Sequence, residues 1–140
     1  MSNSFHSICN VGITPIDTLL HESLHIQAEY KSSNPSDQPT KWSVELIFDY
    51  THSKHIVSLG EYNGMNDLDM DIESIDIHDI PPYILHNVAV LTIKCYNTDN
   101  ILLSDHHTVV QIYIEPKTKQ LRRCIKTNVS STSNVPTAPT

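Results

Sequence analysis

Residues 21 to 25 read His-Glu-Ser-Leu-His and match the HExxH pattern of zinc peptidases. On a helix, His21 and His25 would share one face and could bind the same zinc ion, with Glu22 as the general base. The pattern also arises by chance, and 9 histidines among 140 residues make a chance match easier. The chemistry therefore depends on whether these residues lie on a helix or on a strand.

The residues around His25 favour a strand. Apolar side chains occupy every second position from Leu24 to Tyr30, a period typical of a half-buried strand. In a strand, residues four apart share a face but lie about 13 Å from each other, too far to bind one ion. The chain also lacks the HExxHxxGxxH extension that would supply a third ligand. We therefore expect no enzyme activity, no catalytic residue, no metal and no cofactor, and keep zinc at His21, Glu22 and His25 as the weaker alternative.

The same alternation continues through most of the chain and predicts a fold made of strands. Trp42, Val44, Leu46 and Phe48 share one face of the segment 41–50. Segments 87–96 and 107–115 are rich in residues that favour strands, and 97–100 predicts the turn between them. Pro81-Pro82 interrupts the strands and predicts a short helical turn. The whole pattern predicts an all-β, immunoglobulin-like β-sandwich with short helical turns in its loops.

Length and composition predict one domain and a tail. A chain of 140 residues suits a single folded domain, which we place at 1–118. Residues 119–140 are basic at first and then rich in Ser, Thr and Pro, which predicts a disordered tail. The three cysteines show no CxxC spacing, so we expect reduced thiols. Neither a signal peptide nor a membrane-spanning stretch is visible, so we expect a soluble intracellular protein.

The charges are unevenly distributed along the chain. All 16 acidic residues lie at or before Glu115, where only 4 of the 9 basic residues lie, which gives this part a net charge of −12. The 5 remaining basic residues fall between Lys117 and Lys126. An acidic body would repel phosphates, so we expect no direct nucleic-acid partner. It is compatible with a basic protein partner, although solubility alone would also account for it.

Several segments, in this order and spacing, resemble a known family. They are NVGITP (10–15), LHIQAEY (24–30), KWSVELIF with Trp42, VSLGEYN (57–63) and DIPPYILHNVAVLTIKCYN (79–97). Together they resemble the anti-silencing-function histone chaperones, over about residues 10 to 115. The resemblance implies a non-enzymatic chaperone that binds histone H3–H4 dimers for nucleosome assembly and disassembly. It also implies a monomer in the nucleus, with a cytoplasmic pool, and no membrane contact.

The resemblance also implies which residues bind the histones. Val90 matches a centrally placed valine that contacts an H3 helix, and Val88 and Thr92 lie on the same face. The H4 tail would add as a strand to the edge of segment 107–115, at or beside Val109, Gln111 and Tyr113.

The chain departs from the family at two places. The family's Arg and paired Tyr correspond to Ser104, His107 and Thr108, and the acidic residues beside its Trp correspond to residues 39–41. Other chromatin-assembly factors are therefore uncertain partners. An immunoglobulin-like adaptor with another protein partner is the alternative function.

Overall fold

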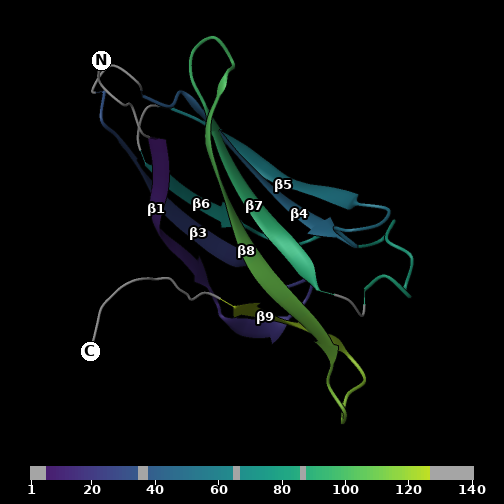
Figure 1. Ribbon diagram of the computed structural model, residues 1–140. Helices are drawn as coiled ribbons and strands as arrows, with labels where there is room; N and C mark the ends of the chain where they lie inside the picture. The colour runs from purple at the N-terminus through teal and green to yellow at the C-terminus, as the bar shows by residue number, and fades with distance from the viewer. Residues whose placement is uncertain (1–5, 35–37, 65–66, 86–87, 127–140) are drawn as a thin grey trace, which may run out of the picture.

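The computed structural model describes residues 6–34, 38–64, 67–85 and 88–126 (Figure 1). These residues form nine strands and no helix, so no helix in this part of the chain is long and apolar enough to cross a membrane. The strands are β1 (His6–Thr14), β2 (Asp17–Leu19), β3 (Leu24–Ser32), β4 (Lys41–Phe48), β5 (His55–Asn63), β6 (Leu68–Ile72), β7 (Ala89–Tyr96), β8 (Leu102–Ile114) and β9 (Leu121–Lys126).

The strands make two antiparallel sheets that pack as two layers. The smaller sheet has the order β1-β3-β6, and the larger has the order β2-β9-β8-β7-β4-β5. Figure 1 shows β1, β3 and β6 as one layer and β4, β5, β7 and β8 as the other. The predicted all-β sandwich is therefore confirmed.

The alternation seen in the sequence defines the core between the sheets. The four apolar residues that begin with Trp42 on β4 are almost completely buried, as are Leu91 and Ile93 on β7. From the smaller sheet, Ile26 and Leu68 face them in the same core cluster. Burying one large aliphatic side chain stabilises the fold by about 1.5 to 3 kcal/mol. The other face of each strand is left for solvent or a partner.

The turn between β7 and β8 forms where the sequence predicts it. The Asn97 side-chain oxygen accepts hydrogen bonds from the backbone nitrogens of Asp99, at 2.9 Å, and Ile101, at 3.0 Å. Asn100 has a φ of 62°, a conformation that asparagine tolerates better than most residues.

The segment after Pro81 forms a turn rather than a helix. The backbone nitrogen of Ile84 donates to the carbonyl of Pro81 at 3.0 Å, and that of Leu85 donates to Pro82 at 3.1 Å. The prediction of a helical turn is therefore right in its local bonding pattern, but these two bonds are too few to make a helix.

The folded domain extends past residue 118, where we expected it to end. Leu121–Lys126 is β9, which pairs with β8 from Ile114 to Val109 and with β2 on its other side. Ile125 is buried in the core. The sandwich therefore reaches Lys126. The structure describes residues 119–126 of the predicted tail, and of these only 119 and 120 lie outside a strand. The predicted disorder of 127–140 lies outside the described residues.

Candidate functional site

An apolar row crosses the outer face of the larger sheet. Ile47 of β4 pairs with Ile56 of β5 on one side and with Val90 of β7 on the other, and Val90 pairs with Val109 of β8. Directly paired residues share a face, so these four side chains point the same way. None of the four belongs to the core cluster between the sheets: Ile56 and Val109 are 55% and 45% exposed and Val90 is half-buried, whereas Ile47 is only 8% exposed. We call Ile47, Ile56, Val90 and Val109 the apolar row.

A shallow hollow lies next to the row, at the turn between β4 and β5. Val88 and Val90 line one side of it, and four residues of the turn, Asp49 to His52, line the other. The hollow has a volume of about 370 Å³. It is large enough to accept an apolar side chain from a partner.

The turn is held in shape by Asp49. Its carboxylate accepts hydrogen bonds from the Ser53 hydroxyl at 2.8 Å and the Ser53 backbone nitrogen at 3.4 Å, and contacts His52 Nδ1 at 3.0 Å. The bond from the Ser53 hydroxyl, and then the bond from His52, hold the pKa of the Asp49 carboxyl below its usual value. The wall of the hollow is thus pre-organised and negatively charged.

An aromatic ring connects the turn to the sheet. Tyr50 meets the His107 ring edge-on, with 6.5 Å between ring centroids and 78° between planes. The ammonium of Lys54 lies 5.1 Å from the centre of the Tyr50 ring, within reach of a cation–π interaction. These contacts place Tyr50, which is partly exposed, at the border of the hollow.

Polar and charged groups border the row elsewhere. Lys94 forms an ion pair with Glu45 at 3.6 Å, and His107 Nε2 lies 3.4 Å from an Asp105 carboxylate oxygen. An apolar centre with a polar border is the usual composition of a protein-binding surface.

Two of the three residues expected to contact H3 are accessible. Val88 is 50% exposed and Val90 is half-buried, and both line the hollow. Thr92 is only 1% exposed, and its hydroxyl is 3.1 Å from His107 Nδ1, so its side chain is covered by the sheet itself. Val109 is in the row, although the sequence suggested a different role for it. Ile47 and Ile56 were not predicted, although Ile47 is an apolar residue on the polar face of segment 41–50.

The expected free edge at 107–115 is largely occupied. β9 pairs with β8 along residues 109 to 114, so Val109, Gln111 and Tyr113 lie on an interior strand. The Tyr113 hydroxyl donates to the Asp17 carboxylate at 2.8 Å, and Arg122 Nε bonds the same carboxylate at 3.2 Å. Because β9 already pairs with the backbone of β8 along residues 109 to 114, a partner strand cannot add to β8 there.

The HExxH residues do not form a zinc site. His21 lies in the turn between β2 and β3, where the Glu22 nitrogen donates to the Leu19 carbonyl at 3.2 Å, whereas His25 lies in β3. A helix is needed to bring the two histidines together, and the chain forms a turn and a strand here. Among the described residues, no group of three or more His, Cys, Asp and Glu side chains could hold a metal ion.

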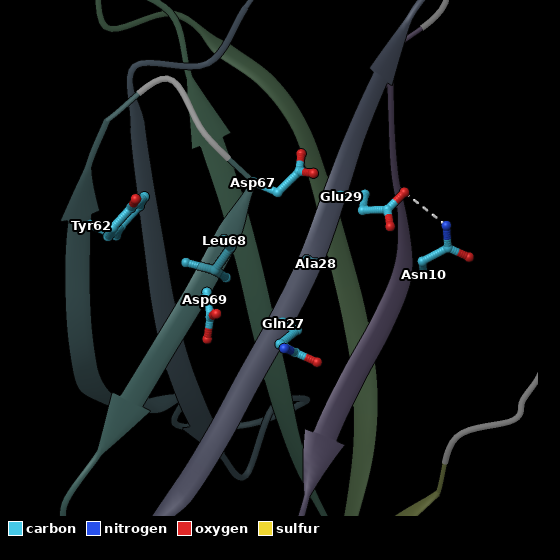
Figure 2. Close-up of a pocket in the computed structure, with 8 residues that line it drawn as sticks. All are labelled: Asn10, Gln27, Ala28, Glu29, Tyr62, Asp67, Leu68 and Asp69. Carbon is cyan, nitrogen blue, oxygen red and sulfur yellow. Dashed lines mark hydrogen bonds between the residues drawn. The ribbon is translucent and has the colours of Figure 1, made fainter.

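A larger hollow, of about 590 Å³, lies on the smaller sheet (Figure 2). It is lined by Asn10, Gln27, Ala28, Glu29, Tyr62, Asp67, Leu68 and Asp69. Asn10 Nδ2 donates to Glu29 Oε1 at 2.9 Å. Figure 2 shows the carboxylates of Asp67 and Asp69 pointing in different directions, so they do not converge on one ligand atom.

Comparison with known proteins adds no family to this description. Neither a scan against protein-family models nor a search of curated proteins finds a match for the chain. A function is therefore inferred from the apolar row and its surroundings.

Proposed function

We propose that this chain is a histone chaperone that binds H3–H4 dimers with the outer face of its larger sheet and has no enzymatic activity. The apolar row carries the proposal, because apolar side chains in line across four strands, three of them accessible and with polar groups at their border, are typical of a binding surface. The resemblance of segments 10–115 to the anti-silencing-function chaperones supports the choice of partner.

The shape of the row suits a helix. It crosses four strands, which corresponds to about 14 Å at the usual strand spacing of about 4.8 Å. The apolar residues of an amphipathic helix at i, i+4, i+7 and i+11 span about 16 Å, so one helix could cover the row. Val88 extends the contact to the hollow, where one side chain of the helix would insert.

The charge of the body suits a basic partner. The part of the chain up to Glu115 carries a net charge of −12, and histones are basic. Asp49, Glu45 and Asp105 bring part of this charge to the border of the row. The proposal rests only on the outer face of the larger sheet, which would bind H3, because β9 covers the β8 edge that was expected to bind the H4 tail. Such a chaperone would act in the nucleus.

The test is Val90→Arg, with binding to recombinant H3–H4 measured by size-exclusion chromatography and isothermal titration at physiological salt. Val90 lies inside the row, so the mutant would bury an unpaired charge in the complex but leave it in water in the free protein. We expect a loss of at least about 2 kcal/mol of binding free energy, or roughly 30-fold in affinity.

Ile101→Arg is the matched control, because Ile101 is 58% exposed and lies at the turn that follows β7, at the opposite end from Val88. It should bind as the wild type does, and both variants should show the wild-type thermal transition. A folded Val90→Arg protein with unchanged affinity would remove the row from the site. A wild-type chain that forms no complex with H3–H4 would leave the row as the surface of an adaptor for another protein.

A further inference from the structure

His25 joins two strands on the outer face of the smaller sheet. It lies on β3, directly opposite Asp71 of β6. Its Nδ1 is 2.5 Å from Asp71 Oδ1, and its Nε2 is 2.9 Å from Asp69 Oδ1. One ring therefore contacts two carboxylates of the same neighbouring strand, and each contact uses a different ring nitrogen.

This geometry selects one protonation state of the ring. An ionised carboxylate can only accept hydrogen bonds, so each ring nitrogen must donate one. A neutral imidazole carries a single N–H group, whereas the imidazolium ion carries two. Both contacts are satisfied together only when His25 is protonated.

The strand that His25 holds is also anchored in the core, where its end residues Leu68 and Ile72 are buried. β6 has five residues and forms one edge of the smaller sheet, where it pairs with β3 from Leu68–Ala28 to Ile72–Leu24. Removing the ring proton takes away one of the two hydrogen bonds and leaves Asp69 and Asp71 facing each other on one side of the strand without a cation between them. Like charges on neighbouring positions of one face repel.

We propose that His25 is a proton-dependent latch that tightens the attachment of the edge strand β6 to β3 and loosens it when the ring loses its proton. The latch lies on the sheet opposite the apolar row and does not depend on what the row binds.

The groups around His25 favour its protonated form. Asp69 and Asp71 face it from β6, and Glu73, just beyond β6, lines the same shallow hollow. From the β1 side, Thr14 and Pro15 contribute no charge to this hollow. The hydrogen bond to Asp71, and then the negative charges of both aspartates, raise the pKa of His25 above 6.5, while partial desolvation opposes them.

The raised pKa of His25 determines how the stability of the β6–β3 attachment depends on pH. A group whose pKa is higher in the folded state stabilises that state fully below its unfolded pKa, and the stabilisation is lost as the pH rises through the folded pKa. The latch is therefore closed in mildly acidic solution and opens as the pH rises above the folded pKa of His25.

An NMR titration of the His25 ring tests the protonation directly. We expect a midpoint above 6.5 in the wild type, with a larger downward shift for Asp71→Asn than for Asp69→Asn, because the Asp71 bond contributes most. A wild-type midpoint at or below 6.5 would overturn the proposal.

Amide hydrogen exchange tests the loosening of the strand. Protection factors, corrected for intrinsic exchange, should fall for β6 in the wild type as the pH rises through the His25 midpoint found in the titration, and should be lower and pH-independent in His25→Gln. His78→Gln is the control, because His78 is also beside an aspartate, Asp79, but lies outside any strand. It should behave as the wild type. A pH-dependent loss that persists in His25→Gln would show that another group controls β6.

Discussion

At the scale of single residues, Arg123 explains why the HExxH segment begins in a turn rather than a helix. Its side chain is 1% exposed and donates to the backbone carbonyls of Leu19, Leu20 and Glu22 at 3.0, 2.7 and 2.9 Å and to that of Ser23 at 2.7 Å. A buried carbonyl without a donor is costly, so these four bonds stabilise the non-helical path of the chain. The segment that suggested zinc chemistry is thus shaped by a cation about one hundred residues away.

We predict that Arg123→Ala lowers the free energy of unfolding by about 3 kcal/mol, because it leaves several carbonyls of the turn without a donor. Urea denaturation followed by the fluorescence of the single, buried Trp42 measures this change. Lys117→Ala removes the same charge from an exposed position and should change stability by no more than about 0.5 kcal/mol. Equal stability of the two variants would contradict the role given to Arg123.

The candidate site could be predicted in part from single residues. Val88 and Val90 follow from the alternation of the strand and from the family resemblance. Thr92 lies on the same face of the strand as Val88 and Val90, but His107 of the neighbouring strand covers it. The sequence does not reveal which residue of another strand lies opposite a given position. Ile56 was missed for the same reason, since it joins the row only because β5 lies beside β4.

At the scale of elements, the strands were predictable where apolar and polar residues alternate. Strand β9 was missed because basic residues interrupt the alternation of apolar and polar side chains in its sequence. Leu121, Arg123 and Ile125 face the core, so the central inward position is an arginine. In the sequence this segment looks like a basic tail. Only the carbonyls of the distant turn between β2 and β3 make burial of that arginine possible.

We predict that β9 is required for folding. A chain ended at residue 118 loses β9, the buried Ile125 and Arg123, and the second pairing partner of β8. It should show no cooperative thermal unfolding by circular dichroism and should expose the Val110 and Ile112 edge to aggregation. A chain ended at Lys126 keeps every described strand and should unfold with the cooperativity of the full chain. A cooperative transition in the shorter chain would place the domain boundary at 118 after all.

At the scale of the whole molecule, the two outer faces of the sandwich differ in chemistry. The smaller sheet carries Asp67, Asp69 and Asp71 in alternate positions of one strand region, and His25 lies against two of them, Asp69 and Asp71. The larger sheet carries the apolar row, beside which Lys94 forms an ion pair with Glu45 and Lys126 of β9 lies opposite Val109. With the proposed function, the acidic charge would act on a partner from a distance, while the row would act only on contact.

This division predicts how binding to H3–H4 depends on salt. Charges attract a partner over about 10 Å at 0.1 M salt, and this range shortens as salt is added. Raising the salt from about 0.05 to about 0.3 M should therefore lower the association rate constant by roughly tenfold or more and change the dissociation rate constant little. Val88→Ala removes apolar contact without changing charge, so it should raise the dissociation rate and leave the salt dependence of association intact.

Stopped-flow association and surface-based dissociation measurements on the wild type and Val88→Ala distinguish the two contributions. If salt acted mainly on dissociation, the charges would lie inside the contact itself. The acidic border of the row, at Asp49 and Asp105, would then form ion pairs with the histone helix. If association proved insensitive to salt, the net charge of the body would have no part in capturing the partner, and the apolar row would have to select it alone.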